Sequence, residues 1–247
     1  MMQEHGLFFV FLGIEEGTDD GLASFNKDMT VADSLKGISI LKELSIGFDY
    51  GFMLFNPSST FTSVRENLGF LSRLCGDGYT PLAFLRVQPY FETRIEKTLR
   101  REGRLKGNPG SLDYDFFDKS LDHYCHFVAG CLQEWLRSTK GLLNVIRWAQ
   151  NYLTVYPAFF RPSPEFPAIA ENVRKITSAS NLFLLDKLKE LSLIFETGRY
   201  NNGDYRGLRG FKESIDAMHD DARARINNQM IRLLRLSSSP SAEADGN

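Results

Sequence analysis

The sequence of 247 residues predicts an α/β fold, a partial (β/α) TIM-like barrel of about three parallel strand–helix units followed by an α-helical C-terminal region. Two observations predict it. Apolar segments alternate with helical patterns at intervals of about 35 to 40 residues in the first part of the chain. Beyond Leu112 the composition changes to aromatic-rich helical patterns. Because a helix between successive strands makes the strands parallel, we expect one parallel sheet and then helices.

The three predicted strands are short and almost continuously apolar. They are Leu7–Ile14, Phe48–Phe55 and Leu82–Val87. Such runs are typical of parallel strands that are covered on both faces, and we expect this of the first strand. Thr30 followed by Asp33 resembles a capping box at the start of the first intervening helix.

We expect three regions along the chain: residues 1–110 as the partial barrel, 111–236 as a helical extension and 237–247 as a disordered polar tail. The predicted later helices are Ile95–Leu105, Phe116–Arg137, Gly141–Tyr156, Pro167–Thr197 and Phe211–Leu236. Three parallel strands alone would leave two open edges, so we expect the rest of the barrel to belong on the amino-terminal side and to be either missing or supplied by a partner.

Composition limits the classes of function. The formal net charge is −2, so no overall field attracts nucleic acid or an anionic membrane. The three cysteines, Cys75, Cys125 and Cys131, fit neither a CxxC zinc site nor a secreted disulfide framework. No apolar stretch reaches the length of a membrane span. We therefore expect a cytoplasmic protein with no nucleic-acid partner and no membrane span.

The carboxyl ends of parallel strands are where ligands bind in such folds. Glu15 follows the first strand, and its carboxylate suits a ribose hydroxyl or an amino group; the alternative is a solvated loop acid or a helix cap. Gly13 would let a ligand approach the backbone, or it serves an ordinary turn. Arg86 lies within an apolar strand, so it should meet an anionic ligand or a carboxylate in a structural ion pair. Asp49 and Lys27 are partners for such a site or plain surface charges.

The segment DHYCHFVAGC combines His123 and His126 with two cysteines on a predicted helix. The histidine spacing permits metal ligation, but a third ligand is missing, and core packing explains the same residues. We therefore predict no metal site. The arginine-bearing segment DARARINNQMIRLLRL suits an acidic partner or a solvated helix face.

Two long stretches, residues 11–74 (FLGIEEG to LSRL) and 84–107 (FLRVQPYFET to LKG), resemble the fourth to sixth strand–helix units of radical S-adenosylmethionine (SAM) enzymes, in particular the subgroup with a cobalamin-binding domain. The segment DYDFFDKSLDHY resembles a part that follows the barrel in that subgroup. The resemblance implies a SAM-contacting role for Glu15, a basic position at Lys27 and a backbone approach at Gly13. The chain departs from the pattern at Gly51, where other branches have an acid, and in YFET, where PGT is frequent.

The family's CxxxCxxC motif is absent from these 247 residues. The resemblance therefore implies the C-terminal portion of a radical SAM enzyme that contributes SAM and substrate contacts but is not catalytically competent alone. Its expected cofactors are SAM and a [4Fe-4S] cluster, with cobalamin in the full-length parent. Two explanations of the absent motif stay open: a truncated or mis-started reading frame, or one half of a split enzyme whose partner is a separate N-terminal half that carries the cysteines. Whether the substrate is a small molecule or a peptide stays open. The alternatives are a non-catalytic helical binding or scaffold protein derived from such an enzyme, and a remnant without function.

Overall fold

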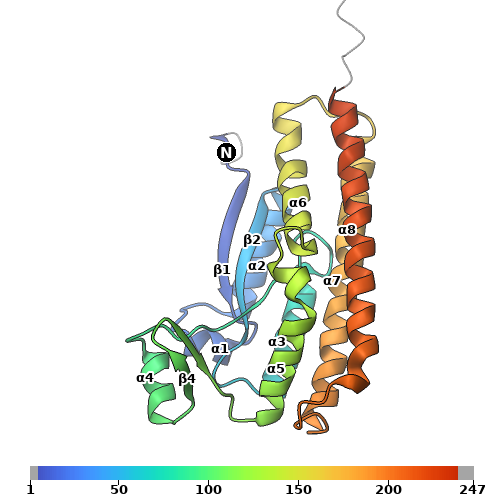
Figure 1. Ribbon diagram of the computed structural model, residues 1–247. Coiled ribbons are helices and arrows are strands. Elements are labelled where there is room, and N and C mark those ends of the chain that lie inside the picture. The colour runs from blue at the N-terminus through green and yellow to red at the C-terminus, as the bar shows by residue number, and fades with distance from the viewer. Residues whose placement is uncertain (1–4, 239–247) are drawn as a thin grey trace, which may run out of the picture.

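The structure, a computed structural model, describes residues 5–238 and has a small sheet layer beside a bundle of long helices (Figure 1). Its elements are β1 (Phe9–Glu15), α1 (Asp19–Ser24), α2 (Val31–Glu43), β2 (Gly47–Phe55), α3 (Phe61–Cys75), β3 (Leu85–Arg86), α4 (Arg94–Arg101), β4 (Leu105–Asn108), β5 (Ser111–Tyr114), α5 (Lys119–Cys131), the π-helix η2 (Gln133–Arg137), α6 (Leu142–Phe159), α7 (Phe166–Glu196), the 3-10 turn η3 (Arg206–Leu208) and α8 (Arg209–Ser238). The fold is mixed α/β with a helical C-terminal region.

The main sheet is parallel and has the order β1-β2-β3. This confirms three parallel strands, but within residues 5–238 they form an open sheet and not a closed barrel. The third strand is shorter than the predicted Leu82–Val87 and contains only Leu85–Arg86. The reason is that side chains hold the backbone before it. The amide of Leu82 donates to Asn181 Oδ1 at 2.9 Å, and that of Ala83 donates to the Tyr50 hydroxyl at 3.0 Å.

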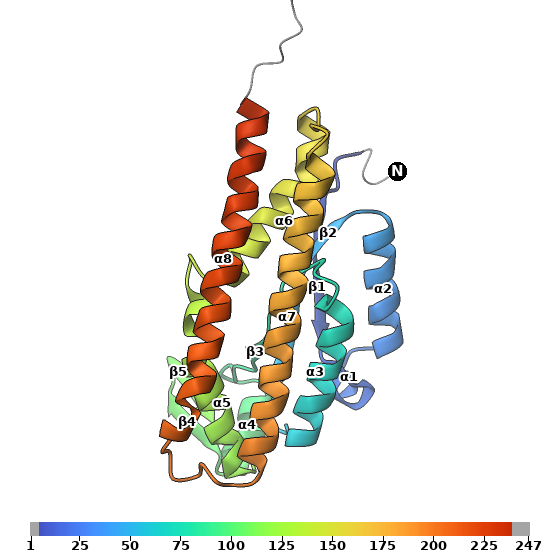
Figure 2. The same cartoon turned by 90° about the vertical axis from the view of Figure 1, so that its right-hand side faces the viewer.

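The two faces of this sheet differ in what covers them. Helices α2 and α3 lie on one side of the strands (Figure 2). On that side alternate residues of β2 are buried, and the ring centroids of Phe52 and Phe70 stack at 5.6 Å. On the other face, Phe9 and Phe11 of β1 are 37% and 69% exposed. We call this the open face. The prediction that the first strand is covered on both faces is therefore wrong for the described chain.

Local signals start the helices of the sheet layer. The capping box of α2 is present, because Thr30 Oγ1 accepts from the Asp33 amide at 3.2 Å and Asp33 Oδ2 accepts from the Thr30 amide at 2.9 Å. Thr60 and Ser63 make the same reciprocal pair at the start of α3. These caps fix the residue at which each helix begins.

The helical region differs in detail from the prediction. The long helix expected over Phe116–Arg137 is divided into α5 and the π-helix η2. The helix expected over Ile95–Leu105 ends at Arg101, because Gly103 takes a left-handed conformation with φ of 69°. An antiparallel hairpin of β4 and β5 follows, which was not predicted and which spans the expected division at residues 110 and 111.

The long helices pack on the sheet layer through α3. Helix α7 lies along α3 on one side and along α8 on the other (Figure 2). Asn181 of α7 donates to the carbonyl oxygens of Cys75 at 2.6 Å and Thr80 at 2.9 Å. Within residues 5–238, no helix is long and apolar enough to cross a membrane. Helix α8 extends to Ser238, and residues 239–247 of the expected tail lie outside the described residues.

Candidate functional site

Three residues singled out in the sequence lie together at the carboxyl end of β1. Lys27 Nζ is 3.5 Å from Glu15 Oε1, and the two side chains are 37% and 25% exposed. A Cβ atom built on Gly13 would lie 2.9 Å from Glu15 Oε1 and 3.4 Å from Lys27 Nζ. A carboxylate and an ammonium group thus meet over a glycine at the strand end.

A local distortion of β1 separates two consecutive glutamates. The register with β2 shifts between Gly13 and Glu15, and Glu15 has a φ of 66°. A left-handed non-glycine residue is uncommon and marks a turn or a constrained site. Here it lets Glu15 meet Lys27 while Glu16 enters the core, where it is 1% exposed.

Glu16 is held by two asparagines that the sequence analysis did not single out for this role. Asn67 of α3 and Asn56, just after β2, each donate a side-chain amide to the Glu16 carboxylate, Asn56 at 3.1 Å. Asn67 Oδ1 also accepts from the Gly17 amide at 2.8 Å. Burial raises the pKa of Glu16, although these hydrogen bonds oppose the shift. A polar Asn67 within the apolar stripe of α3 was the available sequence signal.

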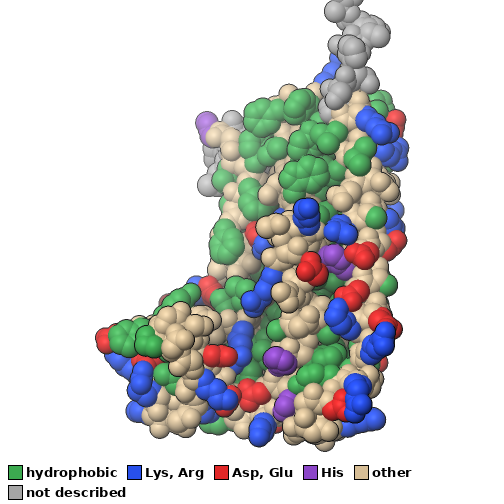
Figure 3. Space-filling model, in the orientation of Figure 1, with side chains coloured by type: hydrophobic (Ala, Val, Ile, Leu, Met, Phe, Trp, Pro, Cys, Tyr) green, Lys and Arg blue, Asp and Glu red, His purple; other side chains and the backbone are tan. Residues whose placement is uncertain are grey.

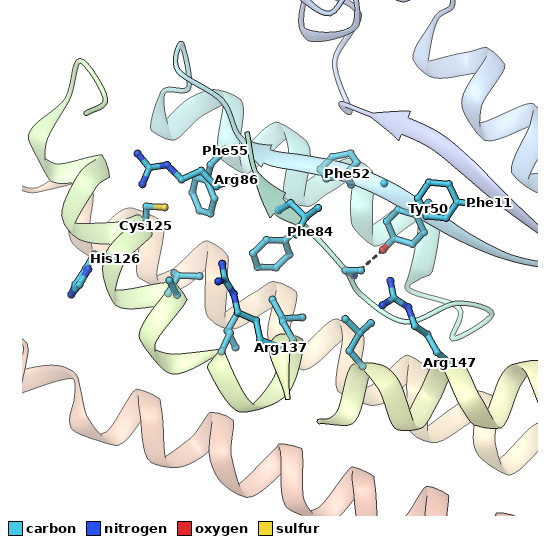
Figure 4. A pocket seen from close by; sticks show the side chains of 18 of the residues that line it. Phe11, Tyr50, Phe52, Phe55, Phe84, Arg86, Cys125, His126, Arg137 and Arg147 are labelled. Carbon is cyan, nitrogen blue, oxygen red and sulfur yellow. Dashed lines mark hydrogen bonds between the residues drawn. The ribbon is translucent and has the colours of Figure 1, made fainter. Parts of the chain in front are cut away.

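A cavity of about 430 Å³ lies between the open face and the helical region. The three strands contribute Phe11, Gly51 and Leu85 to its wall. Helix α5, η2 and α6 contribute the opposite wall, which includes Arg137 and Arg147 (Figure 4). Figure 3 shows apolar side chains gathered over β1 and the upper part of α6 in the same view. Neither Glu15 nor Lys27 lines this cavity.

Two charged strand residues of the sequence analysis form structural ion pairs. Arg86 pairs with Asp113 at 3.1 Å, donates to the Tyr114 carbonyl oxygen, and lies 4.1 Å from the centre of the Tyr114 ring. Asp49 pairs with Arg147 at 2.7 Å, whereas Lys27 pairs with Glu15. Asp49 and Lys27 therefore do not belong to the same site. The ion-pair alternative therefore describes Arg86 better than a free anion site does.

The histidine and cysteine segment does not form a metal centre. His123 Nδ1 hydrogen-bonds the Tyr205 hydroxyl at 2.8 Å, and among residues 5–238 no three His, Cys, Asp or Glu side chains are placed to hold a metal ion. Burial raises the pKa of Cys75 to about 12 and the pKa values of Cys125 and Cys131 to about 11. These buried cysteines also belong to no group of three side chains placed around a common point within residues 5–238, so they do not fit a [4Fe-4S] cluster.

Comparison with known proteins found a distant structural similarity. No protein family matches the sequence, and no curated protein matches it. Among solved structures, the chain is similar to the cobalamin-dependent S-adenosylmethionine radical enzyme OxsB, with a TM-score of 0.42 and 15% sequence identity. The similarity covers 93% of this chain and 41% of that one, so the chain spans less than half of the enzyme's length.

Proposed function

We propose that the chain is the SAM-contacting, C-terminal portion of a radical SAM enzyme, and that Gly13, Glu15 and Lys27 contact SAM. The single observation that carries the proposal is the meeting of these three residues at the carboxyl end of β1. The sequence resemblance picks out the same residues. SAM, when bound in such enzymes, supplies a deoxyadenosyl group for radical chemistry.

The chemistry of the three residues suits the polar groups of SAM. The Glu15 carboxylate accepts hydrogen bonds from a ribose hydroxyl or from the amino group, and the Lys27 ammonium pairs with the SAM carboxylate. A Cβ on Gly13 would push against the Glu15 carboxylate, so glycine lets this carboxylate lie over the strand beside Lys27, where both charged groups can contact the ligand. In the proposal, this chain binds and orients SAM.

The cluster in this proposal belongs to a polypeptide region outside these 247 residues. The CxxxCxxC motif is absent here, and the buried cysteines do not replace it. We therefore propose that an amino-terminal half with that motif completes the enzyme, and that cobalamin, if used, binds the same complete protein. The chain alone then contributes ligand contacts but no radical formation.

Calorimetric titration of the chain with SAM tests the proposal. We expect binding that Glu15→Gln and Lys27→Met each weaken by about tenfold, because each removes one charge-assisted contact. Glu66→Gln and Lys97→Met are matched controls on exposed helix faces and should leave the affinity unchanged. Gly13→Ala should weaken binding, whereas Gly51→Ala, at the residue paired with Gly13 in the sheet, should not.

Titration with adenosine, which is one part of SAM, separates the roles of the two charged residues. Adenosine has the ribose but no carboxylate, so its affinity should be insensitive to Lys27→Met. Its response to Glu15→Gln tells whether Glu15 contacts the ribose or the amino group. If SAM does not bind the chain, or binds equally to the Glu15, Lys27 and control variants, the proposed SAM site is wrong and the scaffold alternative is favoured.

A further inference from the structure

The cavity between the open face and the helical region has the dimensions of a small-molecule site. Its volume of about 430 Å³ falls in the range of ligand pockets, which are commonly 300–1,000 Å³. Its wall is mainly apolar and aromatic, with Phe55 and Phe84 beside the aliphatic residues of α5 and η2 (Figure 4). Flat apolar molecules pack well against such rings.

One positive charge at this cavity lacks a partner. Of the three arginines in the wall, Arg86 is paired with Asp113 and Arg147 with Asp49. Within residues 5–238, the guanidinium group of Arg137 forms no ion pair and no side-chain hydrogen bond. In Figure 4 its side chain extends from η2 toward Phe84. A guanidinium group in this position favours an anion, because its planar donors match carboxylate and phosphate oxygens.

The floor of the cavity is open because β2 carries a glycine there. A Cβ on Gly51 would meet only the Phe11 ring, at 3.5 Å, so the strand accepts a side chain at this position. Gly51 is also the residue opposite Gly13 in the β1–β2 register. The cavity therefore adjoins the Gly13–Glu15–Lys27 site along the same face of the sheet.

We propose that this cavity binds a small anionic molecule with a flat apolar body, with the anionic group on Arg137 and the flat body against Phe84 and Phe55. The charge of Arg137 and the aromatic wall carry this proposal, and neither depends on SAM. The further assignment of this ligand as the reactant beside SAM rests on the proposed function. The anion is a carboxylate, a phosphate or a sulfonate, which share this chemistry.

Fluorescence titration with a pair of probes tests the cavity. Anilinonaphthalene sulfonate has a flat apolar body with one anion, and N-phenylnaphthylamine has nearly the same body without it. We expect the full chain to bind the anionic probe about tenfold more tightly than the neutral one, as expected for one charge-assisted contact at a partly exposed site. Equal affinities for the two probes, or no binding of either, would overturn the proposal.

Variants locate the binding. Arg137→Gln should weaken binding of the anionic probe about tenfold and leave the neutral probe unchanged. Arg161→Gln is the matched control, since Arg161 is exposed and lies outside the cavity wall. Gly51→Val should weaken both probes by filling the floor, while Gly51→Ala changes them little. An Arg137→Gln effect equal to that of Arg161→Gln, or a folded Gly51→Val protein with unchanged affinity, would place the probe elsewhere and refute the site.

The same preparations separate this proposal from the SAM site. Gly13→Ala should weaken SAM and spare the anionic probe, whereas Arg137→Gln should do the reverse. Probe binding with this pattern but without SAM binding supports the cavity and overturns its assignment as the place of a SAM-dependent reactant. SAM binding without selective probe binding overturns the cavity proposal alone.

Discussion

The two faces of the three-stranded sheet were built from the same strands but have opposite characters. On the side of α2 and α3, Phe52 and its neighbours are fully buried and stack on helix residues such as Phe70. On the open face, Phe11 is 69% exposed, two paired glycines leave the backbone accessible, and a cavity separates part of the strands from the helical region. One face therefore stabilises the fold, and the other offers space for ligands.

Glu15 and Glu16 show what this difference does to identical side chains. Glu15 lies on the open face and pairs with Lys27, and both side chains are partly exposed to water. Glu16 belongs to the helix-covered side and is fixed by two asparagine amides. Position relative to the sheet, and not residue type, separates a group available to a ligand from a group that holds strand ends together.

The largest expected difference between the faces is in packing energy. Phe52→Ala should lower the free energy of unfolding by about 3–5 kcal/mol, because it leaves a cavity in a closed core. Phe11→Ala, on the open face, should cost less than about 1 kcal/mol. Urea denaturation of the two variants measures both values. Similar losses would mean that the open face is packed in solution.

The buried network at Glu16 should come next in size. Asn67→Ala removes the donor to Glu16 and the acceptor for the Gly17 amide, so we expect a loss of about 1–3 kcal/mol in unfolding free energy. Asn228→Ala on the exposed side of α8 is the control and should change it by no more than about 0.5 kcal/mol. A loss no larger than that of the control would show that the network contributes nothing.

The pH dependence of stability sharpens the contrast between the glutamates. Because burial raises the folded-state pKa of Glu16 above 4.5, its contribution is fully present below pH 4.5 and is lost as pH rises through the folded value. The unfolding free energy of the wild type minus that of Glu16→Gln should therefore fall from acid to neutral pH. Urea denaturation of both proteins at one acidic and one neutral pH measures this difference in unfolding free energy. A difference that rises with pH contradicts the burial of this carboxyl group.

The smallest expected effects concern the paired glycines. Gly51→Ala should raise the unfolding free energy by about 0.5 kcal/mol, because it restricts the unfolded chain and its Cβ makes an ordinary contact with Phe11. Gly13→Ala should raise the unfolding free energy by a smaller amount, since its Cβ must displace the Glu15 carboxylate. Thermal unfolding of the two variants measures these changes in stability. An equal increase at both positions would argue against the close approach of the Glu15 carboxylate to Gly13.

Much of the sheet layer could be predicted from the sequence. Apolar runs located β1 and β2, and the Thr30–Asp33 box located the start of α2. The third strand was overextended because its apolar pattern does not show that Asn181 and Tyr50 take its backbone amides. The hairpin of β4 and β5 was missed although its turn, Asn-Pro-Gly, is a recognised signal.

The candidate site could be predicted only in part. Position after an apolar strand picked out Glu15, and the structure brings Gly13 and Lys27 to it. Asn67 and Asn56 were not assigned, because their roles depend on one helix and two strand ends meeting in space. The cavity could not be foreseen, since it forms between the sheet and helices that follow it by many residues.

Asn181 has a consequence for the order in which the chain folds. Its amide group ties Leu82, Thr80 and Cys75 to α7 across 99 to 106 residues of sequence. Contacts over such separations form late, since the intervening chain must first lose its freedom. On the ribosome, these groups have no Asn181 partner until α7 has emerged, so the connection between this stretch and α7 forms only after most of the protein has been synthesised.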